Sequence, residues 1–395
     1  MKIGLFIDAY APSIGGVQTS NITLKESLEA LGHEVYIITL HAVPRQKETD
    51  PYVLRLNGGI PLYIKGLKGY RLLIRYKKFL PKIESLNLDV IHVHTEFGVG
   101  HLGLYASKKL KLPLIYTMHT MYHCFIQKNN FVYLKLFKKM ITKFIDKLLK
   151  KLINEANIII APTQKTLLFF KDYYKIEKNY QIVPSGIKLK KFYSTSYKKE
   201  EIDILKEKLG LKDFFICLYI GRVSEEKEIN IIIDYFSDFY KKNKKSKLLI
   251  IGDGPNKIKL QKQVKKLKLT ENIIFLNFVP NNEIGLYYQL GDVFVGASLF
   301  ETQGLTYIEA LSASLPVLAR YDTALDQVIQ HNQNGFFFRN KEEFVQNLNI
   351  LYNDKKKYYE MSNNAEKSVH NYKQEIFAQK IIDIYQKAIE ENNNK

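Results

Sequence analysis

The chain alternates short apolar runs with longer amphipathic segments. The apolar runs are five to seven residues long and are bounded by Gly, Pro, Asn or Asp, while the segments between them follow the 3.6-residue apolar period of helices. This alternation is typical of βαβ units and of parallel sheets covered by helices. We therefore expect an α/β fold with strands at residues 2–8, 34–40, 89–94, 113–118, 157–161, 214–220, 246–252, 272–278, 292–296 and 315–319.

The expected strands form two sets, each with its own glycine-bearing turns. Between the sets, residues 188–200 are polar and are interpreted as a linker, and three helical patterns follow the second set at 341–352, 354–371 and 374–391. The pattern predicts two doubly wound, Rossmann-like domains, 1–190 and 191–373, with a C-terminal helix at 374–395 that could pack back on the first domain. Ligands are expected at the carboxyl ends of the strands, in a cleft between the domains.

Positive charge is concentrated in the first half of the 395-residue chain, whose formal net charge is +19. Residues 1–190 carry 29 Lys and Arg against 13 Asp and Glu, whereas residues 191–395 carry 30 against 27. Such an excess indicates an anionic partner: nucleic acid, a membrane surface or a phosphorylated ligand. Two segments dominate it, because 65–82 holds seven basic residues and no acid, and 133–151 holds seven lysines and one Asp.

The pattern of residues 133–151 predicts a strongly amphipathic helix. Its apolar positions, from Phe137 and Met140 through Phe144 to Leu152, share one face, and lysines occupy the other. One interpretation is a helix packed on the core with a solvated lysine face. The other is a helix in a membrane interface, attracted to anionic lipid by about 1 kcal/mol per basic residue. The basic residues expected at such a membrane are Arg71, Arg75, Lys77, Lys78, Lys135, Lys138, Lys139, Lys143, Lys147 and Lys150.

Several function classes are disfavoured. No helix-turn-helix, zinc-ligand spacing or ribonucleoprotein motif is present, so no nucleic-acid partner is expected. Two cysteines, Cys124 and Cys217, cannot build a disulfide framework, which favours a reducing cytosol. No apolar run approaches 18 residues, and Met1 leads directly into a strand pattern, so neither a membrane span nor a signal peptide is expected.

Two strand-to-helix turns could bind phosphate. Gly15-Gly16 follows the first strand, but the turn is not the G-x-G-x-x-G of a dinucleotide site, and a simple tight turn is the alternative. In the second half, Gly221-Arg222 follows a strand and Lys227 lies five residues after Arg222. These two cations could neutralise a departing nucleotide diphosphate, although an ordinary surface pair is also compatible with the three nearby Glu residues.

Glu301 and Glu309 bracket the expected start of a helix near Gly304. Glu301 would lie in the preceding loop and suits sugar hydroxyls, while Glu309 would lie inside the helix among apolar neighbours and suits a ribose. The pair is not arranged as the acid and nucleophile of a hydrolase. No D-x-D sequence is present, so no metal is required by any visible motif.

Together these motifs resemble the retaining glycosyltransferases of family 4, which have the GT-B fold. The resemblance rests on the order of Gly15-Gly16, the run 184–187, Gly221-Arg222 with Lys227, the run 252–255 and the E-x7-E spacing of Glu301 and Glu309. More narrowly, the runs 95–97, 119–122 and 301–309 are similar to those of bacterial diacylglycerol glycosyltransferases. Those enzymes add a hexose to 1,2-diacylglycerol at the inner membrane face.

The resemblance implies a role for each matching residue. It implies that Gly16 approaches the donor phosphate and that His119 lies beside the donor sugar, with a structural histidine at a strand end as the alternative. Arg222 and Lys227 would bind the diphosphate. Glu301 would hold sugar hydroxyls with help from the amides of Gly304 and Leu305, and Glu309 would hold the ribose. His92 and His94 alternate on one strand and are interpreted as packing or cleft-lining residues.

The implied activity is transfer of a hexose from a nucleotide sugar, UDP-glucose or UDP-galactose, to diacylglycerol with retention of configuration. No other cofactor is expected, and the implied location is the cytoplasmic face of the membrane, on anionic lipid. Another lipid or a soluble sugar as acceptor, and a non-enzymatic membrane-binding protein on the same scaffold, are the alternatives. One departure from the family is that Ser185 and Lys188 replace its usual Asn and Asp, so no ligand contact is assigned to that turn.

Overall fold

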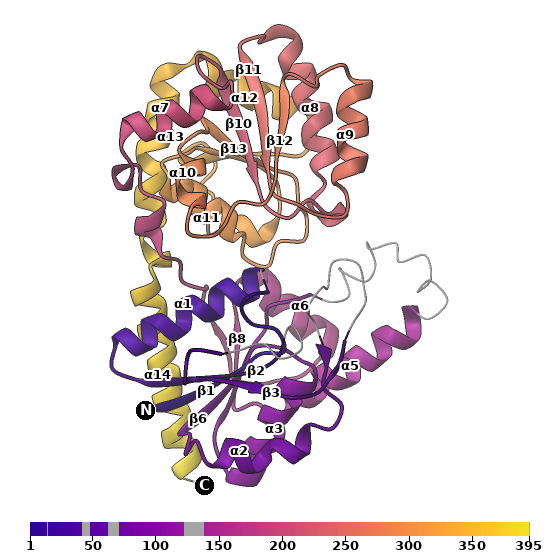
Figure 1. Ribbon diagram of the computed structural model, residues 1–395, viewed down its shortest axis with the longest axis vertical. Helices are drawn as coiled ribbons and strands as arrows, with labels where there is room; N and C mark the ends of the chain where they lie inside the picture. Colours follow the sequence, from indigo (N-terminus) through magenta and orange to yellow (C-terminus); the bar gives the residue numbers. More distant parts are fainter. Residues whose placement is uncertain (14, 42–47, 62–70, 122–137, 395) are drawn as a thin grey trace. The chain divides into compact units, whose positions relative to one another are not determined.

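The computed structural model describes residues 1–13, 15–41, 48–61, 71–121 and 138–394, which fold into two compact units (Figure 1). Unit 1 comprises Met1–Ile187 and Gln374–Lys395, and unit 2 comprises Lys188–Lys373. Each unit is a parallel sheet flanked by helices on both faces. All ten strands expected from the sequence are present, because buried apolar runs between amphipathic helices can only be satisfied in such a sheet.

Over the described residues, unit 1 contains a seven-stranded parallel sheet in the order β3-β2-β1-β6-β7-β8-β9. The chain starts in the centre and winds outward in both directions, as in Rossmann-like folds. Its strands are β1 (Lys2–Phe6), β2 (Glu34–Leu40), β3 (Val53–Leu56), β6 (Val90–Val93), β7 (Leu114–Thr117), β8 (Ile158–Ala161) and β9 (Tyr180–Ile182). The main helices are α1 (Gly16–Ala30), α2 (Leu80–Glu84), α3 (Gly98–Leu110), α5 (Lys138–Glu155), α6 (Gln164–Tyr174) and α14 (Gln374–Asn393).

Alternate residues of the unit 1 strands face two separate cores. Ile3 and Leu5 of β1 face a core that includes residues of α1 and α14. Phe6 faces the opposite core, to which α3, α5 and α6 contribute. The C-terminal helix α14 therefore helps to cover one face of the unit 1 sheet, and it lies against α1 (Figure 1).

Unit 2 contains, within the described residues, a six-stranded parallel sheet in the order β12-β11-β10-β13-β14-β15. Its strands are β10 (Phe215–Ile220), β11 (Ser246–Ile251), β12 (Ile273–Leu276), β13 (Val293–Gly296), β14 (Val317–Arg320) and β15 (Gly335–Phe338). Its helices are α7 (Lys199–Lys208), α8 (Ile229–Lys242), α9 (Lys257–Lys266), α10 (Ile284–Tyr288), α11 (Leu305–Ser312), α12 (Lys341–Asn353) and α13 (Lys355–Ser368). Buried residues of α8, α9 and α12 form the core on one face of this sheet.

The interpretation of residues 188–200 as a polar linker is wrong for its first half. Leu189 and Phe192 are buried in unit 2, and the ring of Phe192 meets that of Tyr288 edge-on with centroids 5.3 Å apart. A short 3₁₀ turn over Leu189–Lys191 presents these side chains. Two apolar residues among lysines are enough to anchor the segment, because each buried side chain contributes about 1.5–3 kcal/mol.

Candidate functional site

Three glycines bring the ends of β10 and β11 in unit 2 into direct contact. A Cβ on Gly252 would lie 2.0 Å from the carbonyl oxygen of Gly221, and one on Gly254 would lie 2.3 Å from that of Val223. The two turns are also joined by hydrogen bonds, from the Val223 amide to Asp253 and from the Asn256 amide to Val223, both 3.0 Å long. The run 252–255 therefore has a structural role, which is to hold the turn that carries Arg222 and Lys227.

Lys227 and Glu301 form an ion pair at the carboxyl end of the unit 2 sheet. The Lys227 Nζ lies 2.7 Å from the Glu301 Oε1, although the two residues are 74 positions apart. The Glu301 side chain is 11% exposed and that of Lys227 is 29% exposed. An ammonium has three N–H donors, and the bond to Glu301 uses one of them. The pair therefore combines a cation for phosphate with a carboxylate that can accept sugar hydroxyls.

Gly304 immediately precedes helix α11 and lies three residues after Glu301. Its φ of 79° lies in the left-handed region, and a Cβ there would meet the Leu325 side chain at 2.4 Å, so only glycine fits. The helix starts at Leu305, as expected from the sequence, and its first amides carry the partial positive charge of a helix N-terminus. Arg222, on the turn after β10, is exposed.

Glu309 lies on α11, where a buried tyrosine holds its carboxylate. The Tyr288 hydroxyl donates to the Glu309 Oε2 at 2.7 Å. Burial raises the pKa of the Glu309 carboxyl, while this hydrogen bond and the nearby Lys191 ammonium act in the opposite direction. Lys191 in turn donates to the Asn281 side chain at 2.6 Å, and burial lowers its pKa. Neither Tyr288 nor Lys191 was selected from the sequence, since each is distant in the chain from Glu309.

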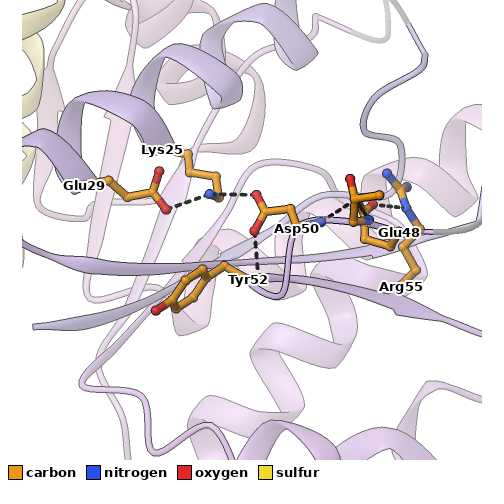
Figure 2. A network of polar contacts seen from close by, with 7 residues as sticks. Lys25, Glu29, Glu48, Asp50, Tyr52 and Arg55 are labelled. Carbon is orange, nitrogen blue, oxygen red and sulfur yellow. Dashed lines mark hydrogen bonds and ion pairs between the residues drawn. The ribbon is translucent and has the colours of Figure 1, made fainter.

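In unit 1, helix α1 begins at Gly16, and a polar network links this helix to residues 48–55 (Figure 2). The Arg55 guanidinium on β3 donates to the Ala11 carbonyl at 2.7 Å and to the Glu48 carboxylate at 2.5 Å. Burial alone would raise the pKa of Glu48, but hydrogen bonds from the Asp50 amide and from Arg55 hold it below the ordinary value. Lys25 of α1 closes the network by pairing with Glu29 at 2.6 Å and with Asp50 at 3.0 Å.

Asp8, which follows β1, is a buried carboxylate that also shapes this region. It accepts hydrogen bonds from the Thr95 hydroxyl at 2.6 Å and from the amides of Phe97 and Val99 at 3.2 and 2.9 Å. Burial raises its pKa, and these three bonds oppose that effect. Thr95 and Phe97, part of the motif at 95–97, thus have a structural partner: they join the end of β1 to the start of α3. The third residue of that motif, Glu96, accepts from the Tyr116 hydroxyl at 2.6 Å.

His119 follows β7 and joins two other histidines of unit 1. Its Nε2 lies 3.0 Å from the Nδ1 of His94, whose ring centroid is 4.0 Å from that of His92. His92, on β6, and His94, just after it, have their rings side by side, as their alternation predicts. Burial lowers the pKa of His119 to about 4 and holds those of His92 and His94 well below the ordinary value. The three rings are therefore neutral at physiological pH.

The turn that departs from the family pattern packs inside unit 1. The Ser20 hydroxyl of α1 donates to the Ser185 hydroxyl at 3.0 Å. A Cβ on Gly186 would lie 2.7 Å from the Phe377 Cβ of α14, so the glycine permits close approach of that helix. Lys188 is exposed.

The lysine-rich helix α5 changes character along its length. Its C-terminal half is anchored in the unit 1 core through Ile145, Leu149 and Leu152. Nearer its start, Met140 and Phe144 are 62% and 53% exposed. The lysines at 139, 143, 147 and 150 are all exposed. Lys135, Phe137 and the side chain of Lys138 lie outside the described part of the chain.

The other basic residues expected at a membrane differ among themselves. The Arg71 guanidinium donates to the carbonyls of Gly58 and Gly59 at 3.1 and 2.9 Å, so it holds together the small hairpin of β4 (Ile60–Pro61) and β5 (Arg71–Leu72). Arg75 is exposed, and Lys77 and Lys78 lie over the rings of Tyr105 and Phe79. Residues 65–70 of the first basic segment lie outside the described residues.

In the ranges that the structure describes, no helix is both long and apolar enough to cross a membrane. Within the same ranges, no three His, Cys, Asp or Glu side chains come together as a candidate metal site.

Comparison with known families and proteins gives consistent matches. Residues 14–191 match the family described as "Glycosyltransferase Family 4", and residues 201–368 match "Glycosyl transferases group 1". The chain is 42% identical, over all of its length and 99% of the relative, to alpha-monoglucosyldiacylglycerol synthase of Acholeplasma laidlawii. It is 33% identical to the enzyme of the same name from Streptococcus pneumoniae, over 87% of this chain and 77% of that one.

Solved structures share the fold at low sequence identity. Sucrose-phosphate synthase of Thermosynechococcus elongatus superposes with a TM-score of 0.79 at 18% identity, covering 98% of each chain. The Anabaena protein HepE, solved in complex with UDP-glucose, gives 0.76 at 17% identity, covering 98% of this chain and all of that one. The expected GT-B fold is thereby confirmed. The chain is a nucleotide-sugar-dependent glycosyltransferase that belongs to glycosyltransferase family 4.

Proposed function

We propose that this protein transfers glucose from UDP-glucose to the free hydroxyl of 1,2-diacylglycerol, with retention of configuration, at an anionic membrane surface. The observation that carries the proposal is the ion pair of Lys227 and Glu301 beside the N-terminus of α11, with Arg222 and Glu309 on neighbouring elements. The names of the two relatives at 42% and 33% identity support the sugar and the acceptor.

Each donor group has a matching residue in this proposal. The remaining N–H donors of Lys227 and the Arg222 guanidinium bind the diphosphate, whose negative charge grows as it departs. The Glu301 carboxylate accepts from sugar hydroxyls, and Glu309, held by Tyr288, accepts from the ribose. In unit 1, Gly16 lets the backbone approach the donor phosphate, and His119 lies beside the donor sugar.

The reaction exchanges one bond at the anomeric carbon for another. The bond from C1 of glucose to the diphosphate oxygen breaks, and a bond from C1 to the acceptor oxygen forms on the same face of the ring. The acceptor proton passes to the departing diphosphate, so no protein nucleophile is required. Lys227 and Arg222 accelerate the step because they stabilise the diphosphate charge more strongly in the transition state than in the bound donor.

The membrane contact is proposed for helix α5 of unit 1. Met140 and Phe144 are exposed apolar side chains next to exposed lysines, which is the composition of a helix that lies in a lipid interface. A soluble acceptor would give no reason for this surface. Diacylglycerol has no charge of its own, so the lysines would bind the anionic lipids around it.

A matrix of donors and acceptors tests the assignment. The purified full chain is incubated with UDP-glucose or UDP-galactose, and with diacylglycerol in phosphatidylglycerol vesicles or with soluble sugars. The expected product is an α-glucosyl diacylglycerol, identified by mass spectrometry and by the anomeric proton coupling. Faster transfer from UDP-galactose would overturn the choice of sugar, and faster transfer to a soluble sugar would overturn the lipid acceptor.

A further inference from the structure

Three imidazoles of unit 1 form a stack that ends at His119. The His94 ring lies between the other two, with centroids 4.0 Å from that of His92 and 5.3 Å from that of His119, the latter pair inclined by only 27°. A single nitrogen–nitrogen contact of 3.0 Å joins the His94 Nδ1 to the His119 Nε2. His94 follows β6 and His119 follows β7, and these two strands are paired in the sheet, so the sheet brings the two residues close together.

His92 and His94 differ in how their nitrogens are satisfied. Both nitrogens of His92 contact hydroxyls, of Tyr385 and of Thr117, at 2.7 Å each. A hydroxyl can donate or accept, so either tautomer of His92 is satisfied. His94 is only 2% exposed, and within the described parts of the chain its Nε2 has no hydrogen-bond partner.

This difference selects the tautomer of His94. A neutral imidazole carries one N–H, so His94 either donates from Nδ1 and leaves a lone pair unpaired at Nε2, or accepts at Nδ1 and leaves an N–H buried without an acceptor. Buried N–H groups without a partner are rarer in proteins than acceptors that lack one. The first arrangement is therefore favoured, in which the His94 Nδ1–H donates to the Nε2 of His119.

We infer that His94 is a positioning residue, which fixes the ring and tautomer of His119 so that His119 presents an Nδ1–H donor to the donor sugar. Because its Nε2 accepts from His94, the single proton of His119 resides on Nδ1. His119 then stabilises a sugar oxygen as a hydrogen-bond donor and does not act as a base. The place of His119 beside the sugar rests on the proposed function, whereas the tautomer rests on the histidine contacts alone.

Nitrogen NMR on the full-length protein tests the tautomer without any activity. With ¹⁵N-labelled histidine, the two-bond and three-bond couplings to the ring protons identify which nitrogen of His119 is protonated, and loss of its signals in a His119→Asn variant assigns them. The expected result is a protonated Nδ1 and an unprotonated Nε2. An Nε2–H tautomer of His119 would overturn the inference whatever the activity, while absence of any sugar transfer would overturn only the proposed function.

Two substitutions separate positioning from packing. His94→Asn retains an N–H donor near the position of Nδ1, whereas His94→Phe retains a planar ring of similar size without a donor. His94→Phe is expected to reduce kcat about tenfold with little change in the donor KM, and His94→Asn to restore kcat to within about threefold. His101→Phe, which alters a buried histidine of α3 outside the stack, is the control and should leave kcat unchanged.

Several results would contradict the positioning role. Equal kcat for the Asn and Phe variants would do so, as would a His119 that keeps its Nδ1–H tautomer in folded His94→Phe. Circular dichroism verifies folding of each variant, and if the Phe variant does not fold, the wild-type spectrum and the Asn variant still decide the question.

Discussion

The two units place different chemistry at the carboxyl ends of similar sheets. In unit 2 the strand ends carry charged groups, namely the Lys227–Glu301 pair and Glu309. In unit 1 the strand ends carry three imidazoles that burial keeps uncharged, those of His92, His94 and His119, and the Asp8 carboxyl group, whose partners are a hydroxyl and two backbone amides. The larger net positive charge of unit 1 is therefore not carried by the groups at the ends of β1, β6 and β7.

Part of the excess charge of unit 1 lies instead on the exposed lysines of helix α5. This separation suits a lipid glycosyltransferase, because the nucleotide diphosphate needs a few fixed cations, while attraction to a membrane needs many mobile ones over a wide surface. The net charge of a domain therefore indicates what kind of partner its surface binds, but it does not show where the catalytic residues lie. If the two groups of charges act independently, a substitution in one unit should leave the function of the other unit unchanged.

The largest effect is expected from Lys227→Met. In the proposed site, this change removes one of the two cations that bind the diphosphate and breaks the ion pair with Glu301, so kcat should fall about 10²–10³-fold. Steady-state transfer from UDP-glucose measures it. Lys259→Met is a matched control, because Lys259 lies on nearby α9 and its Nζ pairs only loosely with Glu225, at 3.8 Å. Similar losses of kcat in both variants would mean that transfer depends on the total positive charge of unit 2 and not on Lys227 in particular.

The next largest effect concerns vesicle binding. Substituting both Met140 and Phe144 by Ser removes the exposed apolar side chains of α5, and affinity for phosphatidylglycerol vesicles should fall about 30-fold, since each apolar side chain contributes roughly 1 kcal/mol or more on insertion. Sedimentation with vesicles measures it, at low and at high salt. Ile258→Ser on α9 of unit 2, where Ile258 is 70% exposed among lysines, is the control. An equal loss for Ile258→Ser would contradict the assignment of membrane contact to unit 1.

A smaller effect is expected from Arg55→Met. The Arg55 guanidinium donates to the Ala11 carbonyl, in the loop before Gly16, and to the Glu48 carboxylate, so the variant loses the hydrogen bond that joins this loop to β3. The KM for the nucleotide sugar should rise about tenfold while vesicle binding stays unchanged. Lys2→Met, which removes only a surface pair with Glu34 at 3.9 Å, controls for lost charge in unit 1. An unchanged KM would show that the loop does not depend on β3.

The smallest effect concerns the stability of Glu309→Gln. Burial raises the pKa of Glu309 above its value of 4.5 in an unfolded chain, so the folded state binds the proton more tightly and loses stability as pH rises through the folded pKa. Gln cannot ionise and can still accept from Tyr288. Glu309→Gln should therefore be more stable than wild type at pH 7, by about 1 kcal/mol, and nearly equal to it at pH 4. Urea unfolding at both pH values measures this, and greater stability of wild type at pH 7 would contradict it.

Much of the fold follows directly from the apolar pattern, because buried parallel strands are nearly continuous apolar runs. The strands that the pattern did not predict are short or interrupted. β3 (Val53–Leu56) contains Arg55 and β9 (Tyr180–Ile182) has three half-buried residues, so neither has a clear apolar period. β15 (Gly335–Phe338) begins with glycine and follows a polar loop.

The site was predictable only where its residues are close in the chain. The spacing of Glu301 and Glu309 and the start of α11 at Leu305 could be inferred because both depend on local helix geometry. The contacts of Lys227 with Glu301, of Tyr288 with Glu309 and of His94 with His119 join separate strands or helices. A single sequence carries no signal for such pairs until the sheet order is known.

The most direct test of the central claim is transfer of labelled glucose to lipid by the full chain and by Lys227→Met, in phosphatidylglycerol vesicles that contain diacylglycerol. The account predicts an organic-soluble α-monoglucosyl product that depends on the vesicles and falls at least 100-fold in the variant. Unreduced transfer by Lys227→Met, or no lipid product from any UDP-hexose, would contradict it.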